Sequence, residues 1–222
     1  MDEKALSKAL VILNKLGERI DPRQSIAVSD ILQTKSRVEE SINSIIEMKE
    51  ITDKRLLTMI EILNTIAYAS FKSGKRQLYA SLTLKMVDLS LMQCISKYSS
   101  PAICNFAILL HSIEDKSSYV IGKLSLKLLE KLKSKELIPA VNCSFYSMIS
   151  PFYSPLRKDL DSLRRTAVVS IEISSHHFTK MNIASYSLPY FFCGKPLLKL
   201  LDKLSEFEGV LVQRTKLDLS VH

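Results

Sequence analysis

The chain has 222 residues, of which 46% are hydrophobic and 24% are charged, with a formal net charge of +8. These proportions are typical of a folded domain and exclude an intrinsically disordered chain. The chain contains only five Gly and seven Pro residues, and a sheet-rich fold needs more turn-forming residues than this. We therefore expect helices joined by short loops.

The excess of basic residues is spread along the chain, with a mild surplus between Lys116 and Lys135. A net positive charge favours an anionic partner only where the cations gather on one surface. We interpret most of these cations as the solvated faces of helices. A nucleic-acid surface is the alternative.

The four cysteines indicate a reducing environment. They lie 10, 39 and 50 positions apart, and each stands in an apolar, helical context: Cys94, Cys104, Cys143 and Cys193. We expect buried free thiols. The N-terminus "MDEKALSKAL" is charged and amphipathic, unlike a signal peptide, and the longest apolar runs are too short to cross a bilayer. We therefore expect a cytoplasmic protein without a membrane span.

Apolar residues recur at helical spacing along almost the whole chain. The pattern predicts ten helices, within residues 5–16, 21–45, 52–73, 75–96, 99–113, 117–136, 134–150, 154–174, 178–193 and 195–209. Gly17, Gly74 and Gly194 are positioned to end three of them. Residues 211–222 alternate apolar and polar side chains only weakly, and we leave them open between helix and strand.

Several predicted helix starts carry residues suited to a first turn. Pro22 and Pro101 stand where a proline loses no helical hydrogen bond. Ser100 is the cap candidate for the helix that holds Pro101, and Thr52 or Asp53 is the candidate for the helix that follows them.

The spacing of the helices is the most informative pattern. Helix starts near Ser117, Pro155 and Pro196 are 38 and 41 residues apart, and each interval holds two helices. A two-helix unit that repeats at about this length is typical of a helical solenoid. We predict an all-α fold, a tetratricopeptide-like helical repeat array (α-solenoid) of about ten helices over residues 1–210, followed by a tail at 211–222.

A glycine interrupts one predicted helix, in the stretch "SSYVIGKLSLKLLEKLKSKE", where it costs about 1 kcal/mol relative to alanine. Gly122 and Ser125 are three residues apart and share one side of that helix. We interpret the pair as a helix-packing contact that lets a neighbouring helix approach closely. The alternative is that the helix starts at Gly122. Lys123, Lys127 and Lys131 recur every four residues, and we assign them to the solvent side.

The sequence carries no catalytic signature. Its three Gly-Lys pairs lack the spacing of a phosphate-binding loop, and the protein-kinase motifs are missing. The adjacent His176 and His177 are poorly placed to share a metal ion, and we assign them to a turn between two helices. Cys143 and Cys193 would each need a histidine nearby in space to act as nucleophiles. We expect no enzyme activity, no cofactor and no metal site.

Several segments, in order, resemble one known region. These are "LNKLGERI", "MKEITDKRLLTMIEIL", "MVDLSLMQCISKYSSPAICNFAILL", "YVIGKLSLKLLEKL", "SPLRKDLDSLRRTAVVSIEI" and "LPYFFCGKPL". They resemble the helical-repeat region of large multidomain signalling proteins, which lies between a STAND-type AAA ATPase and GAF or histidine-kinase domains, downstream of a serine/threonine kinase-like domain. The resemblance covers roughly residues 5–208. It implies a module for protein contacts, with a signalling ATPase or kinase as partner, and a chain that is a fragment, a truncated product or a free-standing relative.

Aromatic residues cluster near two predicted turns, in "SFYSMISPFYSP" and "SYSLPYFF". They are either core between repeats or a partner groove, because aromatic residues often dominate binding hot spots. The candidates for a groove are Tyr146, Phe152, Tyr153, Tyr190 and Phe191. We expect a non-catalytic protein-interaction or regulatory module. A basic, helical nucleic-acid-binding transcriptional regulator is the alternative, recognisable by steeply salt-dependent binding.

Overall fold

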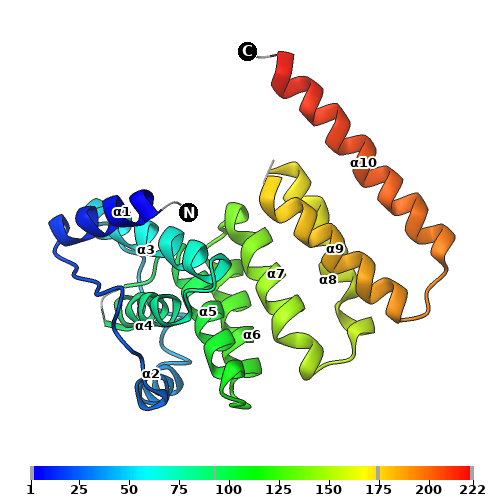
Figure 1. Ribbon diagram of the computed structural model, residues 1–222. Helices are drawn as coiled ribbons and strands as arrows, with labels where there is room; N and C mark the ends of the chain where they lie inside the picture. Colours follow the sequence, from blue (N-terminus) through cyan, green and yellow to red (C-terminus); the bar gives the residue numbers. More distant parts are fainter. Residues whose placement is uncertain (1–2, 93, 174–175, 221–222) are drawn as a thin grey trace. The chain divides into compact units, whose positions relative to one another are not determined.

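The computed structural model describes the backbone of residues 3–92, 94–173 and 176–220, and the side chains of residues 5–92, 94–173 and 178–212. Within these ranges it contains ten α-helices, two short 3-10 helices and no β-strand (Figure 1). The all-α class expected from the sequence is confirmed. The chain divides into two compact units, Met1–Lys133 and Ser134–His222.

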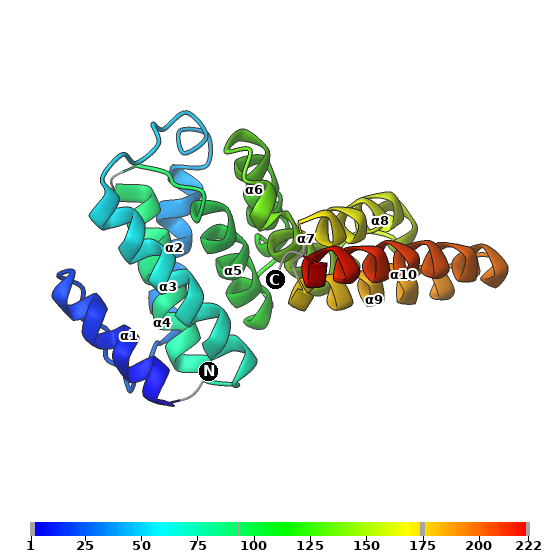
Figure 2. The ribbon, with the colours of Figure 1, turned by 90° about the horizontal axis from the view of Figure 1, so that it is seen from above.

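The described part of the first unit contains six helices. They are α1 (Glu3–Lys15), α2 (Val28–Glu40), α3 (Lys54–Lys72), α4 (Arg76–Met92), α5 (Ser99–Ser112) and α6 (Ser118–Lys131). α3 packs on α4, α4 on α5 and α5 on α6, while α1 packs on α3 and α2 packs on α4 (Figure 2). The segments before α3 and α5 also meet, since the N–H of Ile51 donates to the carbonyl of Ile95 at 2.8 Å.

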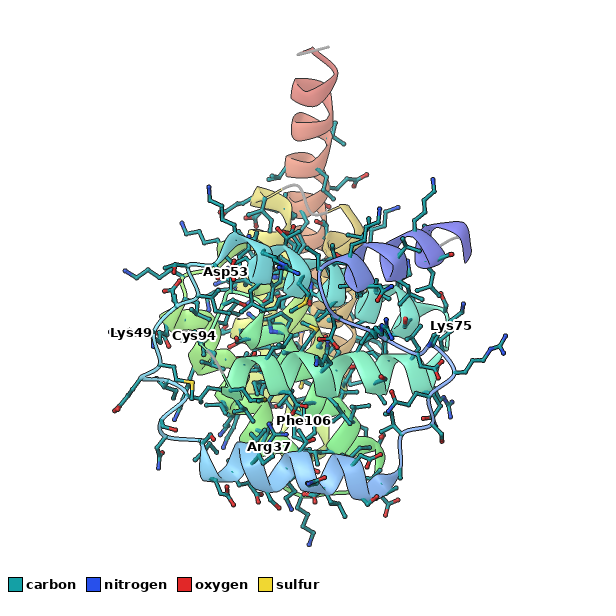
Figure 3. All side chains as sticks on the ribbon, turned by 90° about the vertical axis from the view of Figure 1, so that its left-hand side faces the viewer. Arg37, Lys49, Asp53, Lys75, Cys94 and Phe106 are labelled. Atoms are coloured by element: carbon teal, nitrogen blue, oxygen red, sulfur yellow. The ribbon has the colours of Figure 1, made fainter. Side chains whose placement is uncertain are left out.

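Three helix ends of the first unit follow from local sequence. Gly17 follows α1 with a φ of +90°, and Gly74 follows α3 with a φ of +68°. Glycine adopts this left-handed backbone without the steric cost that a Cβ brings. Asp53 (labelled in Figure 3) caps α3, because its carboxylate accepts a hydrogen bond from the backbone N–H of Arg55 at 2.8 Å.

The predicted helix start at Pro22 is wrong. Residues 18–27 form an irregular segment, and α2 begins at Val28. Within that segment the carboxylate of Asp21 accepts a hydrogen bond from the backbone N–H of Arg23 at 2.9 Å. A local side-chain contact of this kind competes with helix formation.

Ser100 does not cap α5 as predicted. The helix begins one residue earlier, at Ser99, whose hydroxyl accepts a hydrogen bond from the N–H of Ser96 at 3.0 Å. Ser100 is instead fully buried, and its hydroxyl donates to the backbone carbonyl of Ser125 in α6 at 2.8 Å. A position that looked like a helix terminus is a contact between two helices.

Small residues lie on the buried side of α6. Gly122 and Ser125 are both buried, and the hydroxyl of Ser125 donates to the carbonyl of Gly122 at 2.6 Å. Since α6 begins at Ser118, Gly122 lies in its second turn and does not start the helix. The carbonyl of Ser125 accepts from α5, so the backbone of α6 lies within hydrogen-bonding distance of a side chain from the neighbouring helix.

Ion pairs attach α2 to the rest of the first unit. The guanidinium of Arg37 (Figure 3) lies 2.7 Å from the carboxylate of Asp88 in α4. The ammonium of Lys35 lies 2.8 Å from Asp115, which also accepts from the N–H of Ser117 at 2.8 Å. Partial burial opposes ionisation of Asp115, but the hydrogen bonds from Lys35 and Ser117 outweigh it and hold its pKa below the usual value.

The second unit consists, in its described part, of four α-helices and two 3-10 helices. They are η1 (Lys135–Leu137), α7 (Ile138–Met148), η2 (Ser150–Phe152), α8 (Leu156–Glu172), α9 (His176–Phe192) and α10 (Leu197–Ser220). α7, α8 and α9 pack on one another, and α10 packs on α8 and α9. Their apolar core includes Leu163, Ala167, Tyr186, Leu200 and Phe207.

The tail that the sequence left open is helical as far as Ser220. α10 continues through Gly209, the last residue of the predicted helix 195–209, and covers most of residues 211–222. No neighbouring atom lies within 4 Å of the position that a Cβ of Gly209 would take. Gly209 therefore acts neither as a helix end nor as a point of close approach.

A buried polar network joins α7, α8 and α9. Asn182 is fully buried, and its amide nitrogen donates to the carbonyl of Pro139 at 3.1 Å and to the hydroxyl of Ser170 at 2.8 Å. The amide of Asn142 donates to the hydroxyl of Thr166 at 2.8 Å. Because an unsatisfied buried polar group is costly, such contacts favour one alignment of the three helices.

Replacing Gly122 by leucine should destabilise the first unit by about 1–3 kcal/mol, because the larger side chain overpacks the buried side of α6. The matched control is Lys127→Leu, an exposed position on the same helix, which should change stability by less than about 0.5 kcal/mol. Denaturant unfolding followed by circular dichroism measures both. Equal unfolding free energies for the two variants would show that Gly122 is not a packing contact.

Replacing Asp115 by alanine should cost about 1–2 kcal/mol at neutral pH, because it removes the hydrogen bonds to Ser117 and the ion pair with Lys35. The pKa of Asp115 is lowered in the folded state, so its contribution is present above the ordinary value of 3.8 and is lost as the pH falls through the folded-state pKa. The stability difference from the parent protein should therefore shrink in acid. Unfolding measured from neutral pH downward tests this, and a constant difference contradicts it.

Candidate functional site

An open groove lies beside α1 in the first unit. Its volume is about 880 Å³, and it is lined by Leu6, Ser7, Leu10, Val11 and Asn14 of α1, by residues 19–23 and by Lys75. The lining is mainly apolar, with Leu10, Val11 and Ile20 among its members. Lys75, which is labelled in Figure 3, follows α3 and lines the groove.

The local sequence explains how the groove forms. Leu6 and Leu13 are buried, which fixes α1 on α3. Gly17 then turns the chain, so residues 19–23 run back beside the helix that precedes them. The side chain of Arg19 donates from Nε to the amide oxygen of Asn14 at 3.2 Å, which ties that segment to α1.

The charges around this groove are mostly positive. Arg19, Arg23 and Lys75 line it, with Asp21 as the one acidic lining residue. Val11 keeps 53% of its surface exposed at the same place. An apolar floor with a cationic rim suits a partner that combines apolar and acidic groups.

A second, polar pocket lies between residues 18–26, α2 and α4. Its volume is about 390 Å³. Two ion pairs line it, Lys85–Glu18 at 2.9 Å and Arg37–Asp88 at 2.7 Å. Because these charges already neutralise one another, we interpret the pocket as part of the attachment of α2. The sequence did not reveal either hollow, since both depend on the irregular segment that replaces a predicted helix.

The five aromatic residues proposed for a groove all lie in the second unit but differ in burial. Tyr146 and Tyr190 pack against the core of that unit. Phe152, Tyr153 and Phe191 are exposed, at 67%, 37% and 53%. The aromatic cluster read from the sequence therefore divides into core residues and surface residues.

The three lysines of α6, Lys123, Lys127 and Lys131, have different surroundings. Lys123 and Lys127 are exposed, and the ammonium of Lys123 lies 4.5 Å from the ring centroid of Tyr119. Lys131 is exposed too, but its ammonium donates to the backbone carbonyls of Ile46 and Met48. Lys131 thus holds the connection between α2 and α3 against α6.

The described residues contain no cluster of three or more His, Cys, Asp or Glu side chains that would hold a metal ion. Cys143 is buried, and burial raises the pKa of its thiol, which disfavours the reactive thiolate. The backbone of His176 and His177 opens α9 and does not form the predicted turn. Their side chains lie outside the described residues.

Comparisons with protein-family models, with curated proteins and with solved structures found no match to this chain. Among the helices of the described chain, none has the length and apolar character needed to cross a membrane.

Tyr190→Ala should destabilise the second unit by about 1–3 kcal/mol, because the ring packs on the core and lies 5.6 Å from that of Tyr186. The neighbouring Phe191→Ala removes an exposed ring and should cost less than about 0.5 kcal/mol. Thermal unfolding of the two variants measures the contrast. A larger loss for Phe191→Ala than for Tyr190→Ala would reverse the assignment of core and surface.

Proposed function

We propose that this chain is a non-catalytic protein-interaction or regulatory module built as a tetratricopeptide-like helical solenoid. The packing of helices on their neighbours in sequence within each unit supports the repeat arrangement. The resemblance of the sequence to the helical region of multidomain signalling proteins favours a signalling ATPase or kinase as the partner.

The groove beside α1 is the observation on which this proposal rests. Its apolar lining residues, Leu10, Val11 and Ile20, offer a surface for an amphipathic segment. Its cations Arg19, Arg23 and Lys75 outnumber the single acid Asp21. We therefore propose that the groove binds a protein segment with apolar residues on one side and acidic residues beside them.

A photo-crosslinking amino acid at Val11 tests the proposal, with Ile12 as the matched control. Both side chains lie on α1 and are similarly exposed, at 53% and 47%, but only Val11 lines the groove. In cells that normally contain the protein, the Val11 position should crosslink a protein that the Ile12 position does not. Mass spectrometry should place the crosslink in a segment with acidic and apolar residues.

Adding Arg23→Glu and Lys75→Glu should lower the crosslink yield at Val11 by about tenfold or more, since both cations become repulsive to an acidic partner. Equal crosslinking from Val11 and Ile12 would contradict the groove. A crosslinked product that disappears on nuclease treatment, with binding that falls steeply as salt rises, would favour the nucleic-acid-binding regulator instead.

A further inference from the structure

The outer side of α9 is apolar, although it stays exposed to solvent in the second unit. Residues 181–194 contain no charged side chain. The helix buries Asn182 and Tyr186 on one side, yet Met181 and Leu188 on the other side are 43% and 58% exposed. A helix that faces water normally carries charged residues on that side, and an exposed apolar patch marks an interaction site.

This apolar surface is most prominent where α9 ends and α10 begins. Figure 1 shows the two helix ends joined by a short turn at one end of the second unit. Phe191 and Phe192 end α9, with rings whose centroids are 5.5 Å apart. We call the exposed apolar residues around this turn the apolar tip: Phe191, Phe192, Leu197, Leu198 and Leu201, which are 53%, 70%, 53%, 76% and 57% exposed.

Basic residues lie beside the apolar tip, and the nearest acidic residues in sequence, Asp159 and Asp202, come directly after the two basic stretches. Residues 187–201 contain Lys195 and Lys199 and no Asp or Glu, and residues 150–158 contain Arg157 and Lys158 and no Asp or Glu. The two stretches are joined, because the guanidinium of Arg157 donates to the carbonyl of Cys193 at 3.2 Å.

The lysines beside the apolar tip are available to a partner. Lys158 and Lys199 are exposed and Lys195 is half-buried. Within the part of the chain that the structure describes, none of the three forms an ion pair. By contrast, Lys35 and Lys85 in the first unit are held by carboxylates.

We propose that the apolar tip docks on the surface of an anionic lipid bilayer, with its Phe and Leu side chains at the level of the headgroups and its cations against the lipid phosphates. Shallow insertion of Phe and Leu beside Lys and Arg is the chemistry of interfacial membrane binding. Phe192 and Leu198 are 70% and 76% exposed, so they stand out from the surface and do not line a hollow. Projecting apolar side chains suit a fluid interface that rearranges around them.

This proposal is independent of the groove beside α1, which lies in the first unit. Each can fail without the other, because the residues that test them do not overlap. Docking at a bilayer surface also requires no spanning helix, in agreement with the absence of such a helix among the described residues.

Binding to vesicles of phosphatidylcholine with about 30% phosphatidylserine tests the proposal by sedimentation at physiological salt. The parent protein should bind these vesicles and not pure phosphatidylcholine. Lys195→Gln with Lys199→Gln should weaken binding about 25-fold, at about fivefold for each lysine lost. Lys123→Gln with Lys127→Gln has the same spacing and the same change in net charge, and should weaken it less than about threefold.

Tryptophan fluorescence locates the inserted residue, because the chain contains no Trp. Phe192→Trp should give an emission that shifts to the blue with anionic vesicles and is quenched by brominated acyl chains. Phe71→Trp is the control, since Phe71 is a ring exposed by 42% in the first unit, and its emission should not change. Phe191→Ser with Phe192→Ser should lower vesicle binding at least tenfold while thermal unfolding stays close to that of the parent.

Three outcomes would overturn the proposal. The first is no binding to anionic vesicles, and the second is equal loss from the two lysine pairs, which would indicate attraction by net charge alone. The third is binding of single-stranded nucleic acid, with quenching of Trp at position 192 and stronger affinity than for vesicles, which would assign the tip to base stacking.

Discussion

The first unit depends on the burial of one helix, α5, which contains no Asp, Glu, Lys or Arg. Only Asn105, His111 and Ser112 of this helix are not buried. Such a helix is stable in water only when other helices cover it all round. α4 and α6 provide that cover from the two sides, and the hydrogen bond from Ser100 to the backbone of α6 fixes how close one of them comes. The other helices of the unit attach through α4, since α2 and α3 pack on α4 and α1 packs on α3.

α5 and α9 differ in how fully other helices cover them, and this difference bears on the proposed binding surface. Both helices have charge-poor sequences, but the outer side of α9 remains exposed in the second unit. Its buried side is fixed by polar contacts, with Asn182 joined to both α7 and α8. A helix held so firmly on one side, and left apolar on the other, presents a preformed surface to a partner. Preformed surfaces lose little conformational entropy on binding.

The two candidate surfaces share a physical character, although they lie in different units. Each combines apolar side chains with cations that exceed the acids nearby. The positive charge, which is thinly spread along the sequence, therefore forms a local excess of cations at these two surfaces. Elsewhere, cations such as Lys35 and Arg37 serve the fold by pairing with carboxylates across helices. Net charge alone could not distinguish these roles.

Helical periodicity, glycine positions and the Asp53 cap were enough to predict the all-α class and most helix ends, because these depend on contacts within a few residues. The irregular segment at 18–27 was missed, since a side-chain contact of Asp21 and the packing of α1 and α2 outweigh the helical pattern there. The same segment makes the groove, so the groove could not be predicted.

Sequence by itself determined which stretches are helical and which sides of them are apolar, because both properties arise from residue order along a helix. Only the tertiary structure decided which apolar sides are covered. It packed the partly buried Tyr190 against a core and left its neighbour Phe191 exposed. It also showed that Ser100, predicted to cap a helix, instead contacts α6. Burial depends on residues distant in sequence, and no local pattern records their approach.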